Sequence, residues 1–194
     1  MKKTTFFAFA LAAVSGLCAA PVDFNGGFEK CQADTKGVPQ ALGWNKNRVV
    51  SKKAECRLTK ESGCVKSGTF ALMVETEEGG NCFFRSLNSL PVAKGDTIEM
   101  EIFVKGSGKY NLQYIAYGAD DPKRPAFLST LGTGRAKSAN EEKWEKHSVK
   151  VTFNPPAKAK GKYTKFTIIP VINASGDAEL FFDDFAIKVT KAEK

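Results

Sequence analysis

Histidine is almost absent from this sequence, since His147 is the only one among its 194 residues. A histidine general base therefore has a single candidate, and His147 lies at the start of a predicted strand, where we expect a surface side chain. No C-x-x-C pair is present, so the spacing of a zinc site is missing too. These absences argue against zinc-dependent hydrolysis and against acid–base catalysis by histidine, and we expect no enzymatic activity.

Long apolar runs are also missing beyond the first twenty residues, which argues against a transmembrane segment. The formal charge is +8, and two of those charges are Lys2 and Lys3. The remaining lysines are scattered and form no basic stripe with interleaved aromatics, so we expect no nucleic-acid partner. A solvated surface is the simplest reading of the positive charge, and an acidic polysaccharide or an anionic cell surface is the alternative.

The opening stretch "MKKTTFFAFALAAVSGLCAA" has the layout of a secretory signal peptide. We expect cleavage after Ala19, because Pro21 disfavours a cut after Ala20. Lipidation at Cys18 is the alternative, but Leu17 is the wrong residue before such a cysteine. The sequence thus predicts a signal peptide over 1–19, a single domain over 20–194, and a secreted or periplasmic location.

Four cysteines remain after the predicted cleavage: Cys31, Cys56, Cys64 and Cys82. Four cysteines in an exported chain predict two disulfides, and three pairings are possible. The sequence does not choose between these pairings.

Helical periodicity is scarce after the leader, whereas period-two alternation recurs in many short runs. The run "DTIEMEIFV" alternates apolar with polar residues, and "KYNLQYIAYG" does so after the turn signal "KGSGK". Turn signals such as "VAKGD" and "NASGD" separate the other runs. Many short strands divided by Gly and Pro predict an all-β protein, an antiparallel sandwich or barrel.

The run "AELFFDDFAIKV" near the chain's end contains an apparent conflict. Read as one regular strand, it places five residues on one face: Phe181, Asp183, Phe185, Ile187 and Val189. That face is apolar apart from Asp183, and a buried carboxylate needs a partner.

Several phrases in order resemble the carbohydrate-binding modules of families 4, 9 and 22. These phrases are "FNGGFEKC", "VPQALGW", "VKSGTFALMVE", "SLPVAKGDTIEMEIFVKGSG", "EKWEKHSVKVTF" and "GDAELFFDDFAIKV". The resemblance runs from about Val22 to Val189 and implies an antiparallel jelly-roll β-sandwich of the galactose-binding-domain-like kind.

The same resemblance implies a structural calcium ion where the first and last strands meet. Its ligands would be Glu29, Asp183 and Asn25, completed by backbone carbonyls around 66–68, in keeping with calcium's preference for oxygen. Asp184 replaces Asp183 in this scheme if the strand carries a bulge. The alternative is that Asp183 accepts backbone N–H groups or pairs with a lysine.

A sugar would lie on an outward sheet face that carries aromatic and planar polar side chains. Asn111, Gln113 and Tyr117 project together if Leu112 and Tyr114 point inward. Arg85 joins them if Phe84 is in the core, and Phe103 projects outward from the preceding strand. Each has a structural alternative: Tyr117 at a sheet edge, Phe103 under a loop, Arg85 paired with a glutamate.

We therefore expect a non-catalytic, secreted, carbohydrate-binding protein stabilised by calcium, whose partner is a polysaccharide or oligosaccharide. Separate glycan-degrading enzymes are further candidate partners. The alternative is a structural or adhesion protein that binds a cell-surface protein and no sugar. A small polysaccharide-active enzyme is a third, weaker hypothesis.

Overall fold

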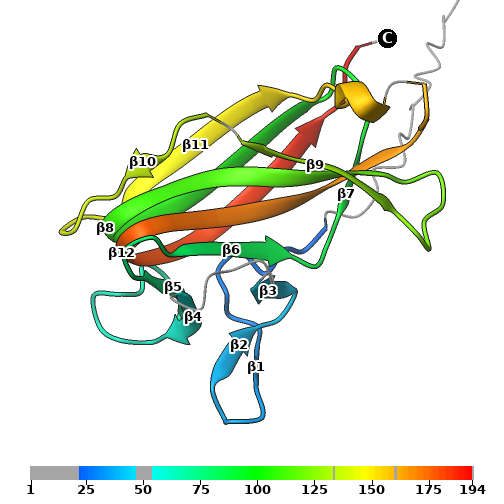
Figure 1. Cartoon of the computed structure of the whole chain (residues 1–194). Helices are drawn as coiled ribbons and strands as arrows, with labels where there is room; N and C mark the ends of the chain where they lie inside the picture. Colours follow the sequence, from blue (N-terminus) through cyan, green and yellow to red (C-terminus); the bar gives the residue numbers. More distant parts are fainter. Residues whose placement is uncertain (1–21, 47–53, 133, 160, 194) are drawn as a thin grey trace, which may run out of the picture.

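Two very long strands organise the molecule, a computed structural model that describes residues 22–46, 54–132, 134–159 and 161–193. Strand β8 spans Thr97–Gly118, and strand β12 spans Phe166–Thr190. They pair antiparallel over almost their whole lengths. Both turn over at the left of Figure 1, so that each strand contributes one half to each of two layers. The sequence predicted two separate strands in each of these segments, and this expectation is wrong.

Glycines make the bend in β8 possible. Gly106 and Gly108 both have a φ of 120°, which L side chains rarely adopt. A Cβ atom on Gly106 would lie 2.1 Å from the Glu179 carbonyl oxygen of β12. The partner strand shifts its register at the same place, between Ser175 and Glu179. The "KGSGK" and "NASGD" signals therefore mark bends inside continuous strands.

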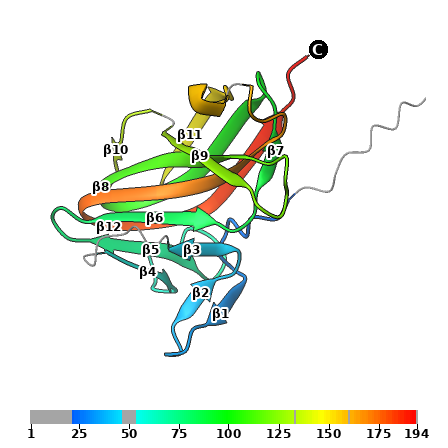
Figure 2. The same ribbon diagram turned by 45° about the vertical axis from the view of Figure 1, so that its right-hand side comes forward.

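The other strands complete the two layers, apart from the first two, which form a separate hairpin. They are β1 (Cys31–Ala33), β2 (Pro39–Ala41), β3 (Trp44–Lys46), β4 (Ala54–Thr59), β5 (Ala71–Thr76), β6 (Asn81–Ser86), β7 (Leu90–Val92), β9 (Ala126–Gly132), β10 (Lys137–Ser138) and β11 (Glu145–Thr152), with a 3-10 turn at Ala157–Ala159. The first layer has the order β11, β8, β12, β5, β4. The second layer has the order β9, β8, β12, β6, β3. The β1–β2 hairpin projects away from both (Figures 1 and 2).

The core lies between the layers and is filled by inward-facing residues of both long strands. Leu112 and Phe182 are fully buried there, and Trp44 stacks on Phe84 with 5.5 Å between ring centroids. This arrangement confirms the predicted all-β fold, an antiparallel jelly-roll β-sandwich. His147 also faces the core and is only 3% exposed, so its predicted surface position is wrong.

The cysteine prediction is not met in this structure. Among the described residues, Cys31, Cys56, Cys64 and Cys82 include no pair at disulfide distance. They lie on four separate segments: β1 in the projecting hairpin, β4, the loop after β4, and β6.

The predicted signal peptide, residues 1–19, lies outside the described residues. Within the described ranges, no helix has the length and apolar character required to cross a membrane.

Candidate functional site

The outward side of the second layer carries most of the residues predicted to bind a ligand. Leu112 and Tyr114 of β8 are buried in the core, so the alternating residues Asn111, Gln113 and Tyr117 face away from it. Phe84 of β6 is also in the core, which turns its neighbour Arg85 outward. Both conditions set by the sequence are therefore met. We call this surface the Gln113 face.

One row across the second layer brings Arg85 and Gln113 together. Val171 of β12 pairs with Arg85 on one side and with Gln113 on the other, so the two side chains flank it. Val171 is completely buried although it faces outward. The Arg85 Nε and Gln113 Oε1 atoms are buried too, and neither has a hydrogen-bond partner among the described residues. A donor and an acceptor without partners thus lie in one row.

The next row of the Gln113 face consists of two amides. Asn173 of β12 lies in register with Asn111 of β8, and each is 8% exposed. The Asn173 Nδ2 atom donates to the Asn81 Oδ1 atom at 2.6 Å, and the Asn111 Nδ2 atom donates to the Gly134 carbonyl at 3.0 Å. These bonds fix both side chains, so the amides present a preorganised polar surface beside Gln113.

An aromatic pair closes the other end of the face. Tyr117 of β8 lies in register with Phe127 of β9, and their rings meet edge to face at 6.1 Å. Phe127 is 57% exposed, which is unusual for so large an apolar side chain. The sequence does not single out Phe127 as a site residue. Its position directly before a bulge in β9, opposite Tyr117, is a feature of register that the sequence does not display.

Phe103 does not belong to this site. It lies on the half of β8 that enters the first layer, in register with Asp183 of β12. The Lys66 ammonium sits 3.9 Å from the centre of its ring, so Phe103 packs under the loop after β4. The structure therefore brings Asn111, Gln113, Tyr117 and Arg85 together and leaves Phe103 on the opposite side of the sandwich.

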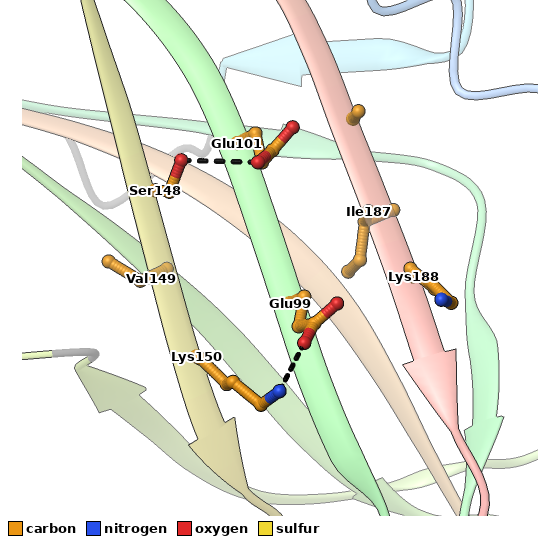
Figure 3. Close-up of a pocket in the computed structure, with 8 residues that line it drawn as sticks. Glu99, Glu101, Ser148, Val149, Lys150, Ile187 and Lys188 are labelled. Atoms are coloured by element: carbon orange, nitrogen blue, oxygen red, sulfur yellow. Dashed lines mark hydrogen bonds and ion pairs between the residues drawn. The ribbon is translucent and has the colours of Figure 1, made fainter.

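The outward side of the first layer carries a cavity of about 430 Å³, shown in Figure 3. Glu99 and Glu101 of β8 line it together with Ser148 and Lys150 of β11. The Lys150 Nζ atom is 2.6 Å from a Glu99 carboxylate oxygen, and the Ser148 hydroxyl donates to Glu101 at 3.2 Å. The hydrogen bond from Lys150 holds the pKa of Glu99 below its usual value. These groups satisfy one another, as expected of a solvated surface ladder.

A bulge in β12 resolves the apparent conflict at Asp183. The register shifts between Asp183 and Ala186, and Asp184 adopts a φ of 50°. Phe182 is in the core before the bulge and Phe185 is buried after it, so the single apolar face expected from the sequence is wrong. Asp183 instead lies on the outer side of the first layer, completely buried beneath the loop after β4.

Asp183 and Glu29 both anchor that loop, residues 60–70. Asp183 Oδ2 accepts the backbone N–H groups of Lys66 and Ser67 at 3.1 and 3.0 Å, and its Oδ1 accepts that of Asp184. Glu29 Oε1 accepts two more N–H groups, three and four residues after Lys66. Burial nevertheless raises the pKa of the Asp183 carboxyl. The beginning and end of the domain therefore meet here, as expected, and Phe185 donates its N–H to the Gly26 carbonyl.

The donors at this corner match the alternative to calcium that the sequence left open. Calcium requires six to eight oxygens, yet Asp183 Oδ2 and Glu29 Oε1 each already accept two backbone N–H groups. The Asn25 Oδ1 atom accepts the backbone N–H of Lys30, and its Nδ2 atom donates to the Leu42 carbonyl. The Asn25 side chain is therefore engaged in bonds to the two ends of the β1–β2 hairpin. Within the described ranges, no three His, Cys, Asp or Glu side chains converge on a common point. This arrangement fits a carboxylate-anchored loop better than an ion site, and calcium stays a prediction.

Comparison with known proteins at the level of sequence gives no result: no family model matches this chain, and no curated protein does.

Comparison of folds does give matches. A cyclase from Fischerella sp. TAU, solved with 4-(1H-indol-3-yl)butan-2-one, is 16% identical, with a TM-score of 0.56 over 88% of this chain and 96% of its own. The arabinose-bound α-L-arabinofuranosidase MgGH51 is 12% identical, with a TM-score of 0.53, and the chain covers 85% of its own length but only 26% of that enzyme. The CBM22-1 xylan-binding domain of Paenibacillus barcinonensis Xyn10C is 17% identical, with a TM-score of 0.49 over 87% and 94% of the two chains. Identities this low establish a shared jelly-roll fold and nothing finer.

Proposed function

We propose that this protein binds a polysaccharide or oligosaccharide on the Gln113 face. The observation that carries the proposal is the row in which Arg85 and Gln113 flank Val171, each with a buried polar atom that has no hydrogen-bond partner in the described part of the chain. Buried polar atoms in folded proteins are nearly always paired, so this row calls for an explanation. Both atoms are closed to solvent here, and a small outward turn of the two side chains would let a ligand supply the missing bonds. The hydroxyl groups of a sugar both donate and accept.

The aromatic pair supports the same proposal. The exposed Phe127 ring and its neighbour Tyr117 offer an apolar surface beside the polar row. The C–H face of a pyranose ring packs on such a surface, while its hydroxyls reach the amides. An apolar platform with a few fixed polar groups is the usual composition of a small-molecule site.

We infer further that the protein binds without catalysing a reaction and acts after export. The second-layer strands supply no carboxylate, and His147 is enclosed in the core, so the face lacks the residues that hydrolysis of a glycoside needs. The signal-peptide pattern supports export, and separate glycan-degrading enzymes are the partners that a non-catalytic binder would assist. Calcium at Glu29 and Asp183 is a separate prediction that the sugar proposal does not need, and the N–H groups bound to these carboxylates do not favour it.

Affinity electrophoresis against a panel of soluble polysaccharides tests the proposed function. The mature domain should be retarded by at least one of them. Gln113→Ala and Tyr117→Ala should each weaken that retardation about tenfold or more, because each removes a direct contact. Ser148→Ala, a polar residue on the opposite layer, is the matched control and should leave retardation unchanged.

The same experiment separates the proposal from its alternative. If no polysaccharide retards the wild-type domain, sugar binding is wrong and an adhesion role with a protein partner becomes the better hypothesis. If both face variants bind as well as the wild type, the sugar lies elsewhere on the molecule. Release of reducing ends would instead reveal an enzyme.

A further inference from the structure

Acidic residues are distributed very unevenly between the two layers. The first-layer strands carry Glu55, Glu75, Glu99, Glu101, Glu145, Glu179, Asp183 and Asp184. The second-layer strands, namely β3, β6, β7, β9 and the second-layer halves of β8 and β12, contain no aspartate or glutamate in their described residues. Their polar residues on the Gln113 face are amides, hydroxyls, the exposed ammonium of Lys109 and the guanidinium of Arg85. The Lys158 ammonium also lies 5.2 Å from the centre of the Phe127 ring.

The Arg85 guanidinium has no counterion in the residues that the structure describes. Within the described part of the chain, Arg85 forms none of the ion pairs found, and its Nε atom is closed off from solvent without a hydrogen-bond acceptor. A half-buried charge without a partner is costly, because the protein replaces the water that would solvate it. The structural alternative of an Arg85–glutamate pair has no glutamate available on these strands.

The geometry points to a ligand that brings the missing negative charge, namely a saccharide that carries carboxylate groups, such as a uronic-acid polymer. This inference rests on the proposed function, since it names the class of sugar for the same face. A carboxylate matches the flat fork of a guanidinium and forms two charge-assisted hydrogen bonds with it. Gln113 and the Asn111–Asn173 row lie beside Arg85 for the neighbouring hydroxyls. The absence of carboxylates from these strands removes the repulsion that would otherwise oppose such a ligand.

A matched pair of polymers tests the inference without changing the sugar. Polygalacturonate carries one carboxylate on each residue, and its fully methyl-esterified form carries none. The wild-type domain should bind polygalacturonate about ten- to one-hundred-fold more tightly than the ester, because a hydrogen bond to a charged group is worth that factor. Arg85→Gln should abolish this preference while it retains the weak binding of the ester. Arg85→Lys should recover it only in part, since lysine lacks the fork.

Two further measurements exclude a trivial explanation. A basic protein attracts any polyanion, so Lys150→Gln on the first layer is the control, and it should keep the wild-type preference. Equal loss of affinity in Arg85→Gln and Lys150→Gln would overturn the inference, because the attraction would then be diffuse. Equal binding of the acid and the ester would also overturn it, yet would leave sugar binding itself intact. If neither polymer nor any other polysaccharide binds, both this inference and the proposed function are wrong.

Discussion

At the scale of single residues, His147 is a polar, titratable side chain that the fold buries in an apolar core. Both ring nitrogens are buried without a partner among the described residues, and the ring meets Tyr110 edge to face at 5.2 Å. Burial, together with the charge of Lys137, lowers the pKa of His147 from 6.5 to about 4. The folded protein therefore holds this imidazole neutral, whereas the unfolded chain protonates it near pH 6.5.

The sign of the resulting pH dependence follows directly. Between pH 6.5 and pH 4 the unfolded state binds more protons at this residue, so the free energy of unfolding falls as the pH falls. The full difference is about 3 kcal/mol, with full stability above pH 6.5 and most of the loss complete near pH 4. Urea unfolding of the wild type and His147→Phe at several pH values measures it. The variant should show a flatter profile over this interval, and parallel profiles would contradict the prediction.

Individual residues also show what the alternation of apolar and polar residues can predict, namely which side chains of a strand face the core. Alternation predicted the inward set correctly in the runs without a bulge, at Leu112–Tyr114 and at Phe84, where Gln113 and Arg85 point outward because their neighbours enter the core. The neighbourhood of each outward residue was not predictable. Whether Arg85 meets Gln113, or Phe103 meets either, depends on strand order and register, and these long-range pairings leave no local pattern.

At the scale of elements, the bend of β8 depends on Gly106, whose missing side chain lets the strand approach β12. We expect Gly106→Ala to destabilise the fold by about 3 kcal/mol or more, since its Cβ atom would overlap the Glu179 carbonyl and its φ of 120° would be strained. Gly134 is a matched control, because its φ is 133° and a Cβ there would have no neighbour within 4 Å. Thermal melts should show a much larger loss for Gly106→Ala, and similar losses would attribute the effect to backbone strain alone.

At this scale, the predictions that the structure contradicts concern the limits and regularity of strands β8 and β12. "KGSGK" and "NASGD" have the composition of turns, and glycine at positive φ serves a bend within a strand as well as a hairpin. The bulge at Asp183 reversed the alternation after it, so Asp183 and Phe185 ended on opposite sides of the strand. An aspartate tolerates the φ of 50° at Asp184, but aspartates are common in ordinary strands too, so no residue type announced this shift.

At the scale of the whole molecule, the predicted calcium ion would join the beginning of the domain to its end, at the corner formed by Glu29, Asp183 and loop 60–70. If calcium binds at Glu29 and Asp183, saturating calcium should raise the melting temperature by about 5 to 10 °C over an EDTA-treated sample. Glu29→Gln should remove that difference. Identical melts with calcium and with EDTA would contradict calcium binding and leave these carboxylates to the backbone N–H groups of loop 60–70 and Asp184.

Asp183→Asn gives a second measurement at the same corner that does not depend on the metal. Its carboxylate accepts three backbone N–H groups in a fully buried position, and an amide nitrogen in place of one oxygen would face donors. We expect a loss of about 2 kcal/mol in EDTA, measured by urea unfolding. An unchanged midpoint would show that the loop is held by other contacts.

The passage of β8 and β12 through both layers also restricts how the molecule can come apart. The same two strands, β8 and β12, form the central pair of both layers. Separating them in one layer therefore strains their pairing in the other. Partial melting of a single sheet should therefore be rare, and the slowest amide protons of both should exchange with deuterium at one shared rate set by global unfolding.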